Sequence, residues 1–341
     1  MDHVDVAFVL DTTGSMAHLI DGAKKKIWSI ADQVRKARPD ATVRFALIGY
    51  RDRGDEYITD VNGLTDDLQD IYAELLRYEA AGGGDTPESV NEALNVAVAK
   101  LDWDRGATSR RLVFLVGDAP PHMDYPQDVP FTASMALAVE KGIVVNAVQA
   151  GDATDTEFAW RSIAALGKGE YMAIPQSGNM QVVETPYDEQ IRGLQLKIDL
   201  TVVPYGSARD QSRVEEKLRL KSESSPAAAA DMAGYMNRAT SKSERKAVTD
   251  DNDLVNRVIS GDVELSTLPG AELPEPMQAM DAEQRKVFID TKIAERDALQ
   301  AEILGLVLER DQYLSEQAEK SGDGGDSFDG EVKETMVRQL M

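Results

Sequence analysis

Through residues 1–205, short apolar runs alternate with segments whose apolar residues recur at helical spacing. The runs are rich in Val, Ile and Phe, which is typical of strands buried on both faces of a sheet. They predict strands at 4–10, 43–49, 112–116, 143–148 and 169–173, with helices at 16–37, 66–79, 87–101, 132–141, 156–167 and 180–194. Strands that alternate with helices indicate parallel β-α-β units, and therefore an α/β fold with an open, mostly parallel sheet.

The pattern changes near residue 205. Leu196–Val203 alternates apolar and polar residues, so we expect a last strand there, closing a first domain over 1–205. Residues 206–320 are charged and alanine-rich and predict a mainly helical C-terminal region, with a proline-rich linker near 268–276. Residues 321–341 predict a flexible tail, rich in Gly, Asp and Ser, with a short terminal helix.

A long helix is expected from about 282 to 320, with Asp281 as its N-cap. Its apolar positions recur in alternating steps of four and three, but polar residues interrupt them at Arg296, Gln300 and Arg310. Two interpretations stay open. The helix docks on its own chain, or it pairs with another helix as a coiled coil, which would allow self-association through 282–320.

Composition narrows the classes of partner. Lys and Arg number 37 against 60 Asp and Glu, and the resulting net charge of −23 is spread along the chain. Such a charge disfavours nucleic acid and anionic membranes and favours a metal cation or a basic protein surface. No apolar run is long enough for a transmembrane helix, so we expect no membrane insertion. Cysteine is absent, which excludes thiol catalysis and cysteine metal sites.

The cellular compartment is weakly constrained by the sequence. The first predicted strand begins almost at Met1, and no signal peptide precedes it. We expect an exported protein, periplasmic or extracellular, whose signal has been removed, with a cytoplasmic protein as the alternative.

The first candidate functional residues come directly after the first predicted strand. Asp11, Thr13 and Ser15 occupy alternate positions there, so their oxygens point the same way as the chain leaves the sheet. Carboxylate and hydroxyl oxygens suit a hard cation. The carboxyl edge of an open α/β sheet is also where ligands bind.

Two further segments supply oxygens at the same edge. Asp118 follows the predicted strand 112–116, and Glu88 opens a helix after a glycine-rich segment. Asp85 and Thr86, next to Glu88, are additional candidates, either as ligands or in support of them. Each residue alone has an ordinary explanation as a helix cap or turn residue, but converging carboxylates would repel one another without a cation.

The segment Asp11-x-Thr13-x-Ser15 resembles the metal-ion-dependent adhesion site (MIDAS) motif of von Willebrand factor A (vWA) domains, and Asp118 matches the later aspartate of that site. The middle segment departs from the commonest version, which has a threonine. Asp85-Thr86-Pro87-Glu88 is more similar to the Asp-x-Pro-Glu loop of integrin β subunits, where the glutamate reaches the metal. The resemblance therefore assigns the middle ligand to Glu88, with Thr86 as its competitor. Bacterial A-domain proteins show similar segments.

The resemblance covers about residues 4–205 and implies a Rossmann-like sheet with helices on both faces. It also implies one divalent cation, with Mg²⁺ favoured over Ca²⁺ and Mn²⁺, whose open position a partner protein fills with an Asp or Glu carboxylate. Loops 50–57, 123–131 and 151–156 would set specificity.

The implied function is protein binding, in adhesion or as a scaffold, without catalysis. One alternative is a regulatory subunit that works with a partner ATPase, as in chelatase-like A-domain proteins. Another is a Mg²⁺-dependent phosphatase-like hydrolase. The nucleophile loop of haloacid-dehalogenase phosphatases needs a second acid where this chain has Thr13, which argues against that enzyme.

Overall fold

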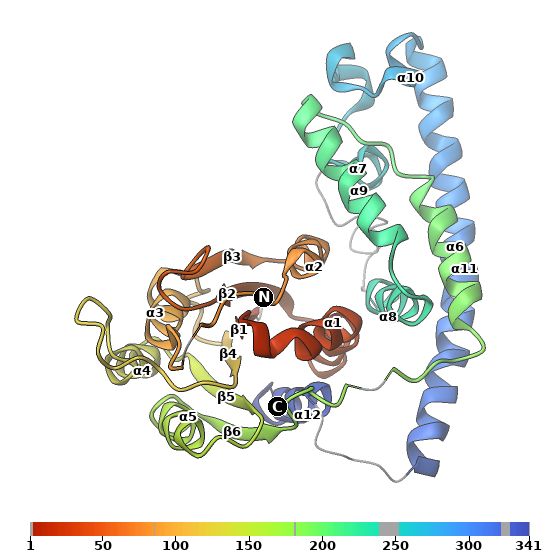
Figure 1. The fold of residues 1–341 in the computed structure, drawn as a ribbon. Helices are drawn as coiled ribbons and strands as arrows, with labels where there is room; N and C mark the ends of the chain where they lie inside the picture. Colours follow the sequence, from red (N-terminus) through yellow and green to blue (C-terminus); the bar gives the residue numbers. More distant parts are fainter. Residues whose placement is uncertain (1–2, 85, 181, 239–251, 322–327, 341) are drawn as a thin grey trace. The chain divides into compact units, whose positions relative to one another are not determined.

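The computed structural model describes residues 3–84, 86–180, 182–238, 252–321 and 328–340 (Figure 1). The chain forms two compact units: Met1–Gln181 together with Gly324–Met341, and Val182–Asp323. The second unit is therefore an insertion in the chain of the first. The chain leaves the first unit at residue 181, before the boundary at 205 that the sequence led us to expect.

The first unit is built on a six-stranded sheet in the order β3-β2-β1-β4-β5-β6. All neighbouring strands are parallel except β3, which runs antiparallel to β2. This confirms the open, mostly parallel α/β sheet. The strands are β1 (His3–Asp11), β2 (Thr42–Tyr50), β3 (Thr59–Thr65), β4 (Arg110–Gly117), β5 (Val144–Ala150) and β6 (Lys168–Ile174).

The edge strand β3 was not expected from the sequence. Its residues, TDVNGLT, contain no apolar run, and all of them remain at least partly exposed. An edge strand with an exposed face needs little apolar surface, so the hydrophobic pattern does not reveal it.

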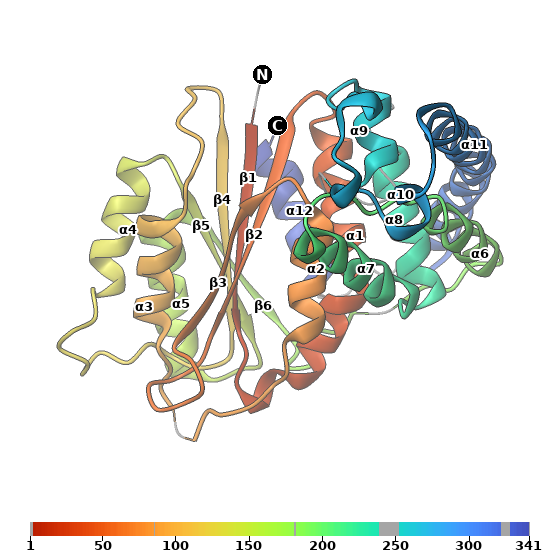
Figure 2. The same ribbon diagram turned by 90° about the horizontal axis from the view of Figure 1, so that it is seen from above.

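Helices cover both faces of the sheet (Figure 2). On one face lie α3 (Val90–Asn95), α4 (Phe131–Glu140) and α5 (Thr154–Leu166), with the π-helical segment Val96–Lys100 continuing α3. On the other face lie α1 (Ala17–Ala37), α2 (Leu68–Arg77) and α12 (Phe328–Leu340), with the 3₁₀ turn Gly14–Met16 before α1.

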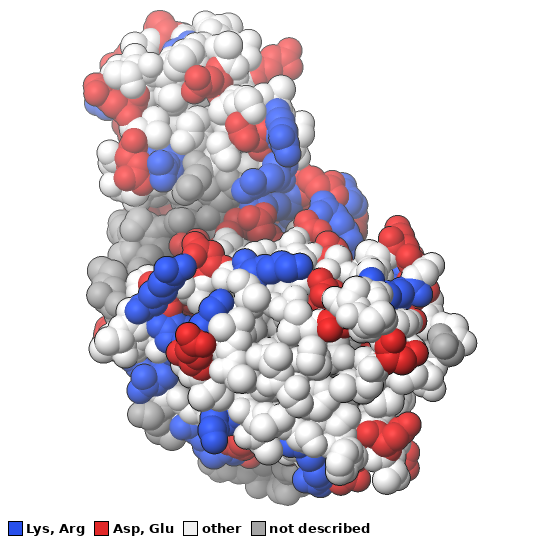
Figure 3. All heavy atoms as spheres, turned by 90° about the vertical axis from the view of Figure 1, so that its left-hand side faces the viewer, with Lys and Arg blue, Asp and Glu red and all other residues white. Residues whose placement is uncertain are grey.

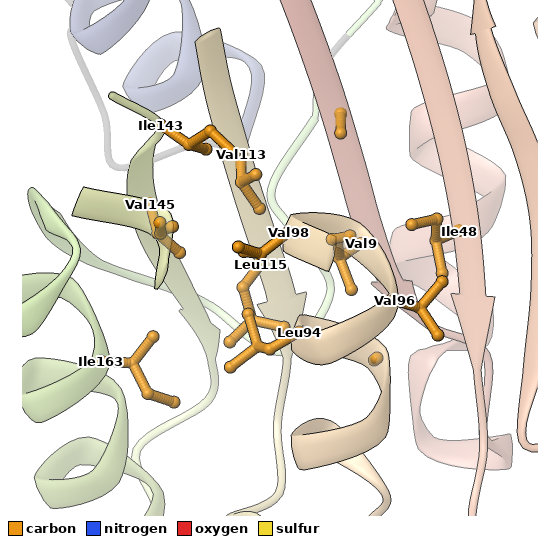
Figure 4. Packing of buried hydrophobic residues seen from close by; sticks show 14 of the residues in the cluster. Val9, Ile48, Leu94, Val96, Val98, Val113, Leu115, Ile143, Val145 and Ile163 are labelled. Atoms are coloured by element: carbon orange, nitrogen blue, oxygen red, sulfur yellow. The ribbon is translucent and has the colours of Figure 1, made fainter. Parts of the chain in front are cut away.

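The core beneath α3, α4 and α5 follows from the two-residue period of buried strands (Figure 4). Val113 and Leu115 of β4 point to the same face and meet Leu94 and Val98 from the α3 segment. Burying each such side chain contributes about 1.5–3 kcal/mol. The central strands are thereby fixed, and with them the positions where their carboxyl ends emerge.

The C-terminal helix α12 belongs to the first unit. It buries Phe328, Val332, Met336 and Leu340, at helical spacing, and it contacts α1. Its first backbone N–H donates to the carbonyl oxygen of Gly178 at 2.9 Å. The short terminal helix expected from the sequence is confirmed, and it packs on the sheet domain. The start of the expected flexible tail, at 322–327, lies outside the described residues.

The second unit is helical, as the sequence predicted for most of it. It contains α6 (Asp188–Asp199), α7 (Ala208–Ser222), α8 (Pro226–Asn237), α9 (Leu254–Ser260), α10 (Glu275–Gln278) and α11 (Ala282–Ser321), with 3₁₀ turns at Leu265–Thr267 and Gly270–Glu272. The strand expected at Leu196–Val203 is wrong, because α6 continues to Asp199. Ile191, Leu194 and Ile198 are buried at helical spacing, and this period outweighs the short alternation that suggested a strand.

The long helix α11 docks on its own chain, which confirms one of the two interpretations. Ile303 and Val307 pack in a buried cluster with residues of α6 and α8. Two of the polar interruptions form buried ion pairs: Arg296 with Asp253 at 2.8 Å, and Arg310 with Asp188 at 2.7 Å. Across the described ranges, no helix has both the length and the apolarity needed to span a membrane.

Candidate metal site

The centre of the candidate site is Asp11, the last residue of β1. Its side chain is fully buried. The backbone N–H and the hydroxyl of Thr13 donate to Asp11 Oδ1 at 2.8 and 2.6 Å, and Thr13 Oγ1 lies 3.4 Å from Ser15 Oγ. The turn after β1 therefore gathers one carboxylate and two hydroxyls. The second oxygen, Asp11 Oδ2, is buried and has no hydrogen-bond partner among the described residues.

Glu88 is fixed by its backbone to the loop that follows β4. Its N–H donates to Pro120 O at 2.9 Å, and its carbonyl accepts from His122 N at 2.9 Å. The side chain is buried, and Glu88 Oε2 also has no hydrogen-bond partner within the described part of the chain. A backbone-anchored, buried carboxylate with a free oxygen is positioned to bind a cation or a proton.

Gly83 allows Glu88 and Thr13 to border the same small space. A β-carbon added at Gly83 would lie 2.8 Å from Thr13 Cβ and 3.0 Å from Glu88 Oε1. The residue also has φ +71°, in the left-handed region that glycine adopts readily. A side chain here would therefore collide with two candidate ligands.

Asp118 follows β4 and is half-buried. Its Oδ2 accepts from Gln176 Nε2 at 2.7 Å, and the same nitrogen lies 3.4 Å from the carbonyl oxygen of Ser15. The preceding residue, Gly117, packs so closely that an added β-carbon would lie 3.1 Å from Asp11 Oδ2. The ends of β1 and β4 thus bring Asp118 to the same edge as Asp11 and Ser15.

The carboxylates influence one another strongly. Burial raises the pKa of Asp11 to about 7, against the opposing effect of the Thr13 hydrogen bonds, and the charge of Asp118 adds to the rise. Burial, followed by the charges of Asp11, Asp52, Asp55 and Asp118, raises the pKa of Glu88 to about 9. These acids therefore hold protons near neutral pH unless a cation compensates their charge.

The structure brings together five of the predicted residues: Asp11, Thr13, Ser15, Glu88 and Asp118. Of the two additional candidates, Thr86 is exposed before a cis peptide bond to Pro87, and Asp85 lies outside the described residues.

The donor set fits a hard cation only if the hydroxyls take part. Within the described ranges, no three His, Cys, Asp or Glu side chains are grouped closely enough to hold a metal ion by themselves. A cation at this edge would draw on the Thr13 and Ser15 hydroxyls and on water as well as on carboxylates. Mg²⁺ accepts such a set, since it keeps several waters and binds one or two carboxylates.

Two supporting residues were missed by the sequence interpretation. Gln176, which donates a hydrogen bond to Asp118, comes shortly after the end of β6. Its position as a polar residue after the last strand of the sheet could have indicated that it lies at the site. Asp52 is buried, and it accepts from Ser89 Oγ and Tyr125 Oη, both at 2.9 Å, while His122 Nε2 lies 3.6 Å away. Asp52 lies in a charged segment, and nothing in that segment signals its burial.

A family model described as von Willebrand factor A domain matches residues 5–185. An ariadne-like RING finger protein of Acanthamoeba polyphaga mimivirus is 32% identical over 119 residues, which is 35% of this chain and 11% of that protein. Human von Willebrand factor A domain-containing protein 7 is 34% identical over 93 residues, 27% of this chain and 10% of its own. The chain spans about a tenth of the length of these relatives.

Similar solved structures include the VWA domain of SpRpn10, with a TM-score of 0.40 and 12% identity over 52% of this chain and 90% of that one. Another is proximal thread matrix protein 1 from the mussel byssus, solved with a zinc-occupied MIDAS motif. It has a TM-score of 0.39 and 19% identity, over 50% of this chain and 41% of its own.

Proposed function

The chain belongs to the von Willebrand factor A family, and from that premise we propose that its first unit is a metal-ion-dependent protein-binding module and not an enzyme. Domains of this family commonly mediate protein interactions, and they generally bind a divalent cation at a MIDAS motif. In this chain the proposed ligands are Asp11, Thr13, Ser15, Glu88 and Asp118, and the proposed partner contributes an Asp or Glu carboxylate.

One observation carries the proposal. Asp11 Oδ2 and Glu88 Oε2 are buried carboxylate oxygens without a hydrogen-bond partner in the described structure. Leaving such a charge uncompensated is costly, and burial raises the pKa of both groups. A divalent cation would supply the missing counter-charge to both.

Mg²⁺ is the preferred ion in this proposal, with Ca²⁺ and Mn²⁺ as alternatives, because the candidate ligands are oxygens and are few. When bound, the cation offers an electrophilic position that a carboxylate can occupy. The residues of this chain fix the site: Thr13 orients Asp11 through two hydrogen bonds, and Gln176 orients Asp118.

The absence of catalysis is part of the proposal. A phosphatase of the haloacid-dehalogenase kind needs a second acid where this chain has Thr13, whose N–H and hydroxyl both donate to Asp11. We expect no hydrolysis of a generic phosphomonoester with Mg²⁺. Turnover that Asp11→Ala removes would support the enzyme alternative.

Thermal unfolding tests the metal site directly. A ligand that binds only the folded state adds about 2.7 kcal/mol at 100 times its Kd, which raises the Tm by about 5–11 °C for a domain of this size. We expect millimolar Mg²⁺ to raise the Tm above its value in EDTA for the wild type and for Asp124→Ala, an exposed rim control. Asp11→Ala should lose the shift. Equal shifts in all three proteins would mean nonspecific ion effects and would contradict the site.

Partner binding has its own test. In a cross-linked pull-down, we expect a partner whose capture is lost in EDTA and with Asp118→Ala. Because this chain has a net charge of −23, the captured carboxylate should be set in a neutral or basic surface, and added salt should weaken capture where that surface is basic. Capture that survives both EDTA and Asp118→Ala would mean that another surface is responsible.

A further inference from the structure

The side chain of Gln176 lies at the exposed side of the candidate metal site. Asp11 and Glu88 are buried there, whereas Gln176 and Ser15 are exposed. A carboxylate that arrives from solvent therefore reaches Gln176 and Ser15 before it reaches the buried acids. Gln176 is thus placed to contact a partner as well as Asp118.

The Gln176 amide donates one strong hydrogen bond and holds a second hydrogen weakly. An amide nitrogen carries two hydrogens, and Nε2 donates one of them to Asp118 Oδ2 at 2.7 Å. The same nitrogen lies 3.4 Å from Ser15 O and 4.0 Å from the sulfur of Met16. These contacts are weak, because N–H···O bonds normally measure about 2.7–3.2 Å and a thioether sulfur is a poor acceptor. The second hydrogen is therefore available to a better acceptor.

The groups around Gln176 determine which way its amide points. Asp118 Oδ2 and Ser15 O are both acceptors, so they face the nitrogen. On its other side the amide oxygen packs against Gly151, where an added β-carbon would lie 2.5 Å from Gln176 Oε1. The amide therefore presents its N–H groups, and not its oxygen, to the metal site.

The turn that carries Gln176 is anchored on both sides. Before the turn, Gly151 N donates to Ile174 O at 2.9 Å, in line with the pairing of β5 and β6. After it, Phe328 N of α12 donates to Gly178 O at 2.9 Å. An anchored donor loses little conformational freedom when a ligand binds, so more of its hydrogen-bond energy contributes to affinity.

Long-range electrostatics do not favour an incoming carboxylate. The chain has a net charge of −23, and Figure 3 shows Lys and Arg side chains interspersed with Asp and Glu over one side of the molecule. Such a surface repels an anion at long range. A carboxylate must therefore be recognised at short range, by the proposed cation and by N–H donors beside it.

We propose that Gln176 is a specificity-determining residue, which donates its second amide hydrogen to the carboxylate of the partner. This role rests on the proposed function, in which that carboxylate binds at the cation. A carboxylate has two oxygens, so one of them can accept from Gln176. Lys and Arg side chains carry donors only and would meet the amide donor to donor. Gln176 therefore selects an acidic side chain over a basic one.

Acetate is a suitable probe, because it is the smallest carboxylate with an apolar substituent. Calorimetry measures Mg²⁺ affinity of the full chain, and an NMR titration at saturating Mg²⁺ measures acetate affinity. Gln176→Ala should weaken acetate binding about tenfold, as the loss of one hydrogen bond to a charged group does. The matched control is Ser177→Ala on the same exposed turn, where the hydroxyl accepts from Asn179 N at 3.4 Å. It should leave acetate affinity unchanged.

Gln176→Glu should change the two affinities in opposite directions. It keeps the length of the side chain but replaces the donor with a carboxylate beside Asp118, so Mg²⁺ should bind more tightly and acetate binding should be lost. A residue that only orients Asp118 would alter Mg²⁺ affinity when it is changed to Ala, and would leave acetate affinity at saturating Mg²⁺ unchanged. Circular dichroism and Tm verify that each variant folds.

Failure of this role is distinguishable from failure of the metal site. If the wild type binds Mg²⁺ and acetate, and Gln176→Ala binds acetate equally well, the role of Gln176 alone is overturned. Should Gln176→Ala not fold, wild-type acetate affinity in Gln176→Glu has the same meaning. A wild type that binds Mg²⁺ but no acetate, or that binds acetate equally in EDTA, overturns this role and the carboxylate partner but not the metal site. A wild type that binds no Mg²⁺ overturns both proposals.

Discussion

Asp11 and Glu88 are acids held in places that disfavour their charged forms. In the folded protein, burial raises their pKa values from the ordinary 3.8 and 4.5 to about 7 and about 9. The folded state therefore retains protons that the unfolded state releases at lower pH. Stability and metal binding are coupled as a result, because a cation removes the reason for the raised pKa values.

The metal-free protein should lose stability as pH rises. Between pH 4 and 7 the unfolded state has released the Asp11 proton while the folded state keeps it, so the unfolding free energy falls by up to about 1.4 kcal/mol per pH unit. Glu88 extends the decline toward pH 9. Denaturant unfolding in EDTA from pH 5 to 9 measures this slope. Asp11→Asn should flatten the lower part of this slope. Saturating Mg²⁺ should remove the slope, because the metal-bound folded state then holds neither proton, like the unfolded state. An identical slope in wild type and Asp11→Asn would contradict the assignment.

Asp52 is expected to act on the metal through Glu88. It accepts a hydrogen bond from Ser89, the residue after Glu88, and another from Tyr125. Asp52→Asn should lower Mg²⁺ affinity about 10–100-fold, the usual effect of removing a residue that orients ligands. Calorimetric titration measures the affinity. Asp124→Asn is the matched control, because Asp124 contacts the same His122 from an exposed position, and it should change the affinity little.

The helix α11 shows how a heptad-like pattern with polar interruptions can belong to a docked helix. Arg296 is 1% exposed and donates to Asp253, Asn256 and Thr201, which lie on segments packed against it. In a coiled coil an arginine at this position would weaken the seam. Here it satisfies several buried acceptors at once.

Removing Arg296 should therefore destabilise the second unit strongly. Arg296→Ala leaves Asp253, which is 0% exposed, without its counter-charge, and losses of this kind are about 3–5 kcal/mol. Arg296→Ala/Asp253→Asn should recover part of this, since Asn can still accept from Val255 N. Chemical denaturation gives the free energies. Lys292→Ala, which breaks the exposed pair with Glu295, should cost at most about 1 kcal/mol. Similar losses for Arg296→Ala and Lys292→Ala would contradict the argument.

Strands covered on both faces were predictable from the sequence as continuous apolar runs, and segments with a mixed apolar and polar pattern were not. Strands such as β1 and β4 are apolar because both of their faces are covered, so the sequence shows them directly. The edge strand β3 and the end of α6 depend on tertiary packing and were missed or assigned wrongly.

The same distinction applies to the candidate site. Asp11 and Asp118 follow such strands, so their meeting at one edge could be predicted. The hydrogen bonds of Asp52 and Gln176 join segments distant in sequence, and no local pattern encodes them.

The first unit consists of two segments that are far apart in the sequence, and we expect it to need both of them in order to fold. Its sheet is complete at β6, yet one helix of its second layer, α12, comes only after the inserted unit Val182–Asp323. The hydrogen bond from Phe328 N to Gly178 O joins the two sides of the insertion at 2.9 Å. The ends of the insertion are therefore close together in the first unit, as expected where one domain is inserted into another.

Two shortened variants should behave oppositely. The segment 1–205, which the sequence suggested as a domain, lacks α12 and exposes the apolar surface that Phe328, Val332, Met336 and Leu340 cover. At about 1.5–3 kcal/mol for each buried side chain, this loss rivals the 5–15 kcal/mol that stabilises a typical domain. We expect that segment to unfold at a much lower temperature or to aggregate. Residues 1–181 joined to 324–341 by a short glycine-serine linker should fold and keep the Mg²⁺-dependent rise in Tm. If the segment 1–205 is as stable as the linked variant, α12 does not belong to the folding unit of the sheet domain.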